Sequence, residues 1–129
     1  MRKEVPKKTT KMRVFNAMVV PMLLYGCETW TILKRHESKL QALEMMCLRR
    51  VEGVSRKDRV RNEEVRKTHG QKAVMNIVKE KQRKWKDKVE AMSENRLVKI
   101  AYMNEVRGRR PRGRPRKRWQ DNVLINSQS

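Results

Sequence analysis

The segment from Gln71 to Met92 most constrains the fold, because its apolar residues recur at the spacing of a helix. They fall mainly three, four or seven positions apart and are Val74, Ile77, Val78, Trp85, Val89 and Met92. That spacing places them on one face of a long helix. The polar face pairs Glu80 with Lys84 and Lys86 with Glu90 at four-residue spacing, which supports a helix modestly.

A second helix is predicted from His36 to Val51. Its apolar positions again lie three or four residues apart, with one more beside them: Leu40, Leu43, Cys47, Val51 and Met46. The predicted far face is charged and carries Glu37, Lys39, Glu44, Arg49 and Arg50. Gly53 is expected to end this helix, since glycine readily adopts the left-handed conformation found there.

A third helix is predicted in the N-terminal third of the chain, with one interruption at Pro21. It starts near Thr9 or Thr10, either of which can act as a cap, and carries Val14, Phe15, Met18, Val19, Met22 and Leu23 on one face. Pro21 should kink or restart it because proline lacks an amide donor. Gly26 is the expected stop, and Cys27 to Leu33 is expected to form a turn or a short extended piece.

Shorter helices complete the predicted fold. One begins with Asn62 as its N-cap and ends near His69 and Gly70, one covers Arg96 to Met103, and one covers Trp119 to Ile125. We therefore expect an all-α fold: a disordered N-terminus over residues 1–8, a small bundle of four to five helices over 9–103, and a disordered basic tail over 104–129 with a short terminal helix. The helices on either side of Gly70 are compatible with a helix-turn-helix or with a plain helical hairpin.

The strong positive charge of the chain indicates what kind of molecule it binds. The chain of 129 residues has 34 Lys and Arg against 14 Asp and Glu, a formal charge of +20. Such an excess favours a polyanion, either nucleic acid or an anionic membrane surface. The longest apolar run, Ala17 to Tyr25, contains Pro21 and is too short to cross a bilayer. Although Leu23 to Cys27 has the look of a lipoprotein cleavage site, the cationic chain around it favours a nuclear or cytoplasmic protein that is neither membrane-bound nor secreted.

Residues for catalysis or metal binding are sparse. Cys27 and Cys47 form no CxxC pair and are expected to be reduced, partly buried thiols. The Asp residues Asp58, Asp87 and Asp121 are isolated from one another, and no glycine-rich phosphate loop occurs. We expect no catalytic residue, no metal, no cofactor and no small-molecule substrate.

The basic stretch near the C-terminus is the strongest candidate for a binding site. Its candidate residues are Arg107, Arg109, Arg110, Arg112, Gly113, Arg114, Pro115, Arg116, Lys117 and Arg118. Arginine contacts phosphates bidentately and also enters narrow minor grooves, and Pro and Gly are expected to keep this backbone extended. The sequence Pro111-Arg112-Gly113-Arg114-Pro115 resembles the AT-hook of high-mobility-group A chromatin proteins. Generic phosphate binding, A·T-selective binding, nuclear import and a merely solubilising tail all remain open.

Further cations suggest a wider surface. The helical part contributes Arg49, Arg50, Arg59 and Arg61 as candidate binding residues. More basic side chains lie in the same loop and on the long helix: Arg56, Lys57, Lys79, Lys81, Arg83, Lys84, Lys86 and Lys88. Taken singly, each cluster is an ordinary solvated face. Together with the tail, they favour a continuous basic surface that binds RNA, an RNA–DNA hybrid or DNA.

Several ordered blocks carry a more specific resemblance. They are Pro21 with Leu24-Tyr25-Gly26, Glu28-Thr29-Trp30-Thr31, Cys47-Leu48-Arg49-Arg50, Asp58 to Val65, Arg83-Lys84-Trp85, Glu94 to Leu97 and Arg112 to Asn122. This order resembles the region that follows the polymerase core in endonuclease–reverse transcriptases of retrotransposons without long terminal repeats. The resemblance implies a thumb-like C-terminal segment that grips template RNA or an RNA–DNA hybrid.

The same resemblance implies a chain that cannot polymerise. The family's Tyr-x-Asp-Asp block lies upstream of this region and is absent here, as is the endonuclease domain. After Trp85 the family usually continues with x-Gly-His-Val, whereas this chain has Lys86-Asp87-Lys88-Val89. The expected protein is a truncated, non-catalytic fragment that retains non-specific phosphate binding. The alternatives are a host DNA-binding protein that uses the hook and a translated remnant without function.

Overall fold

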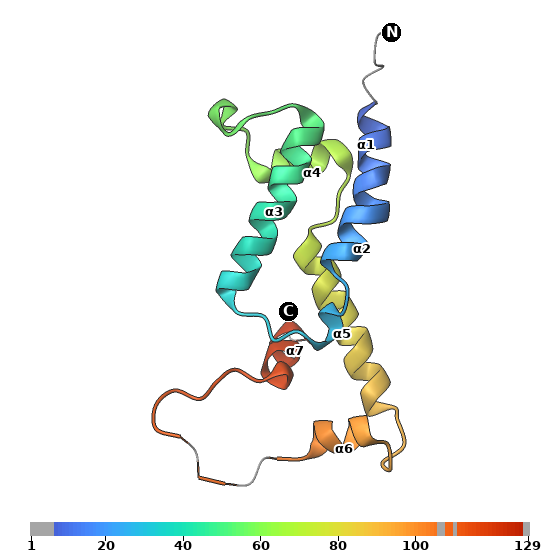
Figure 1. Cartoon of the computed structure of the whole chain (residues 1–129), viewed down its shortest axis with the longest axis vertical. Helices are drawn as coiled ribbons and strands as arrows, with labels where there is room; N and C mark the ends of the chain where they lie inside the picture. Colours follow the sequence, from blue (N-terminus) through green and yellow to red (C-terminus); the bar gives the residue numbers. More distant parts are fainter. Residues whose placement is uncertain (1–6, 106–107, 110, 128–129) are drawn as a thin grey trace. The chain divides into compact units, whose positions relative to one another are not determined.

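The computed structural model describes residues 7–105, 108–109 and 111–127, and these residues form helices and irregular connections (Figure 1). The α-helices are α1 (Lys8–Val14), α2 (Val20–Leu23), α3 (Lys34–Glu52), α4 (Asn62–His69), α5 (Val74–Glu90), α6 (Leu97–Met103) and α7 (Trp119–Ser127). A π-helical segment (Phe15–Val19) joins α1 to α2, and 3₁₀ turns cover Cys27–Thr29 and Arg56–Asp58. The described residues contain no strand, so the predicted all-α class is confirmed.

The chain divides into two compact units. Unit 1 comprises the described residues of 1–26 and 33–78, and unit 2 comprises those of 27–32 and 79–129. The division falls within α5, between Val78 and Lys79. The sequence-based division into residues 9–103 and 104–129 stays a prediction.

Unit 1 has an apolar core to which α1, α3 and α4 contribute. Its buried members are Met12, Phe15, Met45, Leu48 and Val65. Helix α3 packs against both α1 and α4. The predicted inner face of α3 is therefore rotated: Leu40 and Leu43 are only half-buried, whereas Met45 and Leu48 are buried. Because α3 packs against both α1 and α4, these neighbours, and not the apolar stripe alone, decide which of its positions are buried.

Pro21 perturbs the first helix as predicted. Just before it, the backbone widens into the π-helical segment, and the Val20 amide donates to the carbonyl of Phe15, five residues back. Proline has no amide hydrogen, so the carbonyl four residues before it loses its usual helical partner. A single wide turn of this kind absorbs the mismatch without ending the helix.

Glycines end α3 and α4 where the sequence predicts. Gly53 and Gly70 both adopt left-handed conformations, with φ of 75° and 58°. The prediction that Asn62 caps α4 is wrong. Arg61 occupies the cap position and Asn62 is the first helical residue, because the Asn62 side chain accepts a hydrogen bond from Arg49 instead.

Unit 2 has a core with a polar centre. Its buried residues include the apolar Cys27, Ile32, Val89 and Val123 and the polar Gln82 and Asn122. Gln82 is fully buried, and its Nε2 donates to the Cys27 carbonyl at 3.0 Å and to the Trp30 carbonyl at 2.9 Å. Its Oε1 accepts from Nδ2 of Asn122 at 3.3 Å. These bonds link α5 to the turn at Cys27 and to α7.

Helix α6 forms as predicted, and several of its apolar side chains are exposed. Leu97 is 79% exposed and Ile100 is 39% exposed. The pattern correctly indicates a helix, whereas the burial of its residues depends on which neighbours are present.

Candidate nucleic-acid interface

The candidate interface begins with the basic segment, defined here as the described part of residues 108–118. All of its described residues are exposed: Gly108, Arg109, Pro111, Arg112, Gly113, Arg114, Pro115, Arg116, Lys117 and Arg118. Arg107 and Arg110, also predicted to bind, lie outside the described residues. An exposed arginine keeps its guanidinium donors available to a phosphate.

Most side chains of the basic segment have no bond to the rest of the protein. In the described part of the chain, no hydrogen bond or ion pair holds the guanidinium groups of Arg109, Arg112, Arg114 or Arg116. Lys117 is the exception, since its Nζ donates to the carbonyl of Ile32 at 3.3 Å. Lys117 therefore contributes to the structure of unit 2 as well as to its charge.

The residues that directly follow the basic segment are anchored to other parts of unit 2. Immediately after it, Nε1 of Trp119 donates to the Glu28 carbonyl at 2.6 Å. The side-chain amide of Gln120 donates to the backbone carbonyl of Tyr102, which lies in α6. The rings of Tyr102 and Trp119 also meet edge to face, with centroids 6.1 Å apart. The sequence does not reveal this anchoring, because it depends on contacts between distant residues.

The backbone of the hook-like sequence bends. Residues 112–114 form a bend, and Gly113 has a φ of 105°, which favours glycine. The expectation of an extended backbone through Arg112-Gly113-Arg114 is therefore wrong for this conformation. Pro111 and Pro115 restrict their own φ angles, but the glycine between them supplies the turn.

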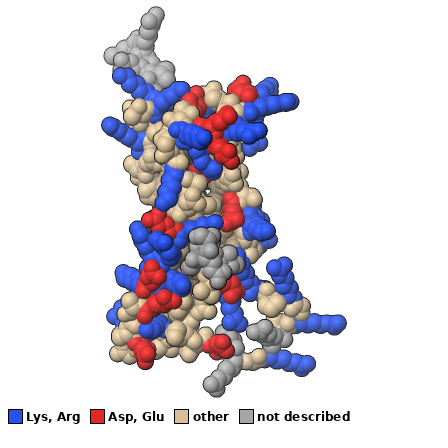
Figure 2. Space-filling model, turned by 180° about the vertical axis from the view of Figure 1, so that it is seen from behind, with Lys and Arg blue, Asp and Glu red and all other residues tan. Residues whose placement is uncertain are grey.

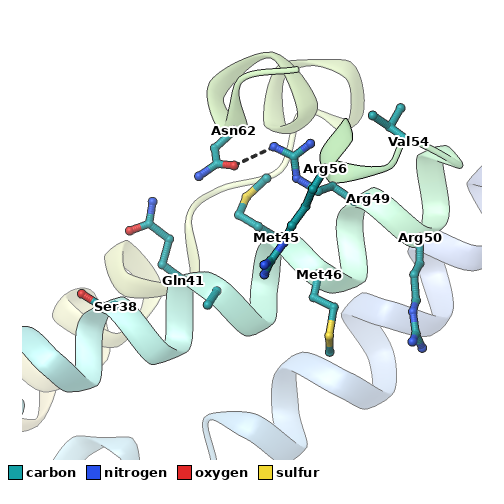
Figure 3. A pocket seen from close by; sticks show the side chains of 10 residues that line it. Ser38, Gln41, Met45, Met46, Arg49, Arg50, Val54, Arg56 and Asn62 are labelled. Carbon is teal, nitrogen blue, oxygen red and sulfur yellow. Dashed lines mark hydrogen bonds between the residues drawn. The ribbon is translucent and has the colours of Figure 1, made fainter. Parts of the chain in front are cut away.

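Arg49 and Arg50 lie together at a pocket in unit 1 (Figure 3). This pocket has a volume of about 630 Å³, and Arg56, Met45 and Met46 also line it. Arg49 has a structural role as well: its Nη2 donates to the Val60 carbonyl at 2.6 Å and to Oδ1 of Asn62 at 2.9 Å. Arg50 is exposed, so it is the better phosphate ligand of the two.

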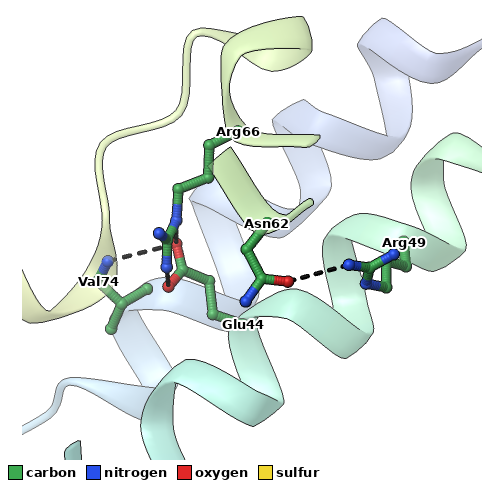
Figure 4. Close-up of polar contacts among 5 residues, drawn as sticks. All are labelled: Glu44, Arg49, Asn62, Arg66 and Val74. Carbon is green, nitrogen blue, oxygen red and sulfur yellow. Dashed lines mark hydrogen bonds and ion pairs between the residues drawn. The ribbon is translucent and has the colours of Figure 1, made fainter. Parts of the chain in front are cut away.

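The prediction that Glu44 lies on the solvated face of α3 is wrong. Glu44 is buried, and its carboxylate accepts from Nη2 of Arg66 at 3.0 Å and from Nε at 3.3 Å (Figure 4). The backbone amide of Val74 also points to this carboxylate, at 3.4 Å. These bonds compensate for the cost of burying a charge. Arg66 is therefore a basic residue with a structural partner.

Arg59 and Arg61 are exposed in the loop between α3 and α4. Asp58 shapes this loop by accepting from the backbone amide of Ser55 at 2.7 Å and from its hydroxyl at 3.1 Å. Arg59 follows in a left-handed conformation with a φ of 52°, which is uncommon for a residue other than glycine. Both arginines stay available as phosphate ligands.

Cations predominate over much of the face shown in Figure 2, although acidic side chains lie among them. The predicted ion pairs on α5 are present, with Lys84 to Glu80 at 3.4 Å and Lys86 to Glu90 at 3.8 Å. Arg49, Arg50, Arg59 and Arg61 belong to unit 1, whereas the basic segment belongs to unit 2. A continuous basic surface across both units stays a prediction.

A polar cluster surrounds Glu52, and no pattern in the sequence indicates it. Its Oε2 accepts from Nζ of Lys8 at 2.7 Å, and its Oε1 lies 2.9 Å from Nε2 of His69. The hydrogen bond from Lys8 lowers the pKa of Glu52, with the charges of Lys8 and His69 acting in the same direction and burial opposing them. The cluster joins the first helix to the ends of α3 and α4.

The cysteines are free thiols, Cys27 buried and Cys47 half-buried. Burial, followed by the neighbouring charge of Glu28, raises the pKa of Cys27 above its ordinary value and disfavours the reactive thiolate. Among the described side chains, no group of three or more His, Cys, Asp or Glu residues is placed to hold a metal ion. Within the same described ranges, we find no helix with the length and apolar content needed to cross a bilayer.

Comparison of the chain with protein-family models, with curated proteins and with solved structures gives no match.

Proposed function

We propose that this protein binds nucleic acid without catalysing a reaction, through phosphate contacts made by its exposed cations. The observation that carries the proposal is the basic segment, in which Arg109, Arg112, Arg114 and Arg116 are exposed. Their positive charge is not neutralised by a carboxylate of the described residues. Binding to a phosphate backbone releases condensed counterions and needs no base-specific geometry.

We also propose that the chain corresponds to the C-terminal region of a retroelement reverse transcriptase. The resemblance in sequence supports this, because its blocks occur in order along nearly the whole chain. Several block residues also have defined structural roles: Leu24 is buried, Asp58 shapes the loop before α4, and Trp119 anchors the basic segment. In that setting the protein would grip RNA or an RNA–DNA hybrid and would leave the chemistry to another domain.

The salt dependence of binding tests the phosphate mechanism. The stretch from Arg107 to Arg118 holds eight cations. If all of them engage duplex DNA, the logarithm of the binding constant should fall with the logarithm of salt concentration with a slope of about −7. Fluorescence anisotropy with a labelled duplex between about 50 and 200 mM salt would provide this slope. An affinity independent of salt would contradict the proposal.

A charge-matched pair of variants locates the binding surface. Replacing Arg112, Arg114 and Arg116 together by Gln should flatten the slope by about 2 to 3 units, at about 0.9 for each phosphate that the variant no longer neutralises. The control replaces three exposed cations of unit 1 by Gln, namely Arg13, Lys34 and Lys39. Both variants have the same net charge, so an equal effect would show that only overall charge matters.

The AT-hook alternative predicts a different result from the same assay. A host DNA-binding protein using Arg112 and Arg114 in a minor groove would prefer A·T-rich duplex, and the double Ala variant would lose that preference. Equal affinity for A·T-rich and G·C-rich duplexes argues for generic phosphate binding. A remnant without function predicts no cooperative thermal transition by circular dichroism and no binding.

A further inference from the structure

A second pocket lies in unit 2, beside the point where the basic segment returns to the helices. Its volume is about 370 Å³, near the lower end for sites that hold small ligands. Trp85 of α5, Tyr102 of α6 and Trp119 of α7 line it, together with Val89 and Val98. The whole chain has three Trp, two Tyr and one Phe. Three of the six aromatic residues of the chain, two Trp and one Tyr, therefore line this one small pocket.

Hydrogen bonds hold two of these rings in place. Trp119 donates to the Glu28 carbonyl at 2.6 Å, and the Tyr102 hydroxyl donates to Oε1 of Glu90 at 3.1 Å. The planes of the two rings are 76° apart. Burial, followed by the bond to Glu90 and its charge, raises the pKa of Tyr102, so the hydroxyl stays protonated near neutral pH. All three aromatic side chains nevertheless retain some exposed surface.

Two cations, Lys88 and Arg118, lie at or near the aromatic pocket. Nζ of Lys88 lies 5.8 Å from the centroid of the Trp85 ring. Arg118 lines the pocket and leads directly into Lys117 and Arg116 of the basic segment. An apolar pocket with a cationic rim suits a ligand that has a flat apolar part and a negatively charged backbone.

The carboxylates near the pocket are engaged within unit 2. Glu90 accepts from Tyr102 and pairs with Lys86 at 3.8 Å, and Asp121 accepts from the Arg118 backbone amide at 3.0 Å. Glu105 is exposed shortly before the basic segment. The positive charge of the rim is therefore reduced but not cancelled.

A nucleic-acid single strand has the complementary chemistry. Its bases can unstack and place one π-face against aromatic side chains, while the phosphates on either side contact cations. In a duplex each base is paired and stacked, so it cannot enter a pocket without a flipping cost. An apolar peptide would fill the pocket but would leave Lys88 and Arg118 without counter-charges.

We propose that this pocket stacks one unpaired base of single-stranded nucleic acid while the basic segment contacts the flanking phosphates. This inference rests on the proposed function and makes it more specific, because it names single strands as the substrate. Stacking uses features common to all bases, so RNA and DNA single strands are both ligands.

The first test compares two probes of equal charge. One is a single-stranded DNA oligonucleotide of twelve thymidines, and the other has the same length and phosphates but an abasic residue at every position. Stacking of one base should make the thymidine strand bind about 5- to 160-fold more tightly. Equal affinities would overturn the pocket proposal while leaving phosphate binding intact. Failure of both probes to bind would instead overturn the proposed function.

Fluorescence reports on the pocket without disturbing its walls. In a Trp30→Phe variant, the remaining tryptophans are Trp85 and Trp119, which both line the pocket. The thymidine strand should quench their emission, whereas the abasic strand and a duplex of equal length should quench it much less. Equal quenching by all three probes would contradict stacking.

Substitution of Trp85 completes the test. Trp85→Ala should reduce the affinity for the thymidine strand to that for the abasic strand, and Trp85→Phe should retain part of the difference. Thermal melts by circular dichroism establish that each variant is folded at the assay temperature. A folded Trp85→Ala protein that still distinguishes the two strands as wild type does would refute the assignment.

Discussion

The arginines of unit 1 and those of the basic segment have the same chemistry but different surroundings. Arg49 and Arg66 use their donors on Asn62, Val60 and Glu44 within unit 1. In unit 2, Arg112, Arg114 and Arg116 are exposed, with no bond to any described residue. A high density of cations in a sequence therefore does not by itself identify a binding surface. Arg49 and Arg66 are half-buried among the helices of unit 1 and have structural partners, whereas the arginines of the basic segment are exposed.

Glu44→Ala should destabilise the protein most. This change removes a buried carboxylate and leaves Arg66 and the Val74 amide without their partner. Breaking a buried pair in this way costs about 3–5 kcal/mol, so unit 1 should unfold at a much lower urea concentration. Chemical denaturation followed by circular dichroism measures the change. Glu63→Gln, at an exposed position of α4, is the control and should change stability by no more than about 0.5 kcal/mol.

Substitution in the polar core of unit 2 should cause the next largest loss of stability. Gln82→Leu keeps a similar size but leaves the Cys27 and Trp30 carbonyls and the Asn122 amide without their partner. We expect the free energy of unfolding to fall by about 1–3 kcal/mol, as measured by a thermal melt. Gln71→Leu, at a half-buried position before α5, is a matched control for the change in chemistry. A stabilising effect of Gln82→Leu would show that the buried polar network is not needed.

Arg49→Gln and Arg114→Gln distinguish the two groups of arginines directly, since each removes one guanidinium. Arg49→Gln should lower the free energy of unfolding by roughly 1–3 kcal/mol, because it leaves the Val60 carbonyl and Oδ1 of Asn62 without their donor. Arg114→Gln should leave stability unchanged but reduce the salt slope of binding by about 0.9. Similar behaviour of the two variants in both assays would remove the distinction between structural and binding arginines.

Glu52→Gln should change stability less than the substitutions above, and its effect should depend on pH. The hydrogen bond of Glu52 with Lys8 lowers the pKa of Glu52 in the folded protein below the ordinary value of 4.5. A carboxyl whose pKa is lowered on folding stabilises the protein above its unfolded pKa, and this stabilisation disappears as the pH falls through the folded pKa. The difference in melting temperature between wild type and Glu52→Gln should therefore be largest near neutral pH and shrink at pH values below the ordinary pKa of 4.5. A difference that stays constant under acidic conditions would contradict this origin.

The helical class and the glycine stops of α3 and α4 can be predicted from the sequence, whereas the buried faces can be predicted only in part. Gly53 and Gly70 end their helices because local conformation decides those positions. The valines of the α5 stripe are predicted correctly, since Val74, Val78 and Val89 are buried. The burial of Gln82 on the same helix is not predicted, because apolar periodicity ignores a polar residue whose partners are distant in sequence.

The candidate site is also predictable from the sequence only in part. The cations of residues 107–118 and their phosphate chemistry follow from composition alone, because a stretch without apolar residues has no core to enter. The aromatic pocket does not follow from composition, since Trp85, Tyr102 and Trp119 lie 17 positions apart from one to the next, much farther than the three- or four-residue spacing that joins neighbours on one helix. The hydrogen bonds of Trp119 and Gln120 bring them together.

The helical class, the glycine stops at Gly53 and Gly70 and the excess of positive charge depend on residues near one another in the chain, and the sequence alone is enough to specify them. Which charges are structural and which are exposed depends on tertiary contacts. Glu44 is buried because Arg66, from another helix, meets it, and the C-terminal end of the basic segment is anchored because Trp119 and Gln120 bond to Glu28 and Tyr102. Burial and hydrogen bonding are properties of neighbours in space, which a linear pattern does not specify.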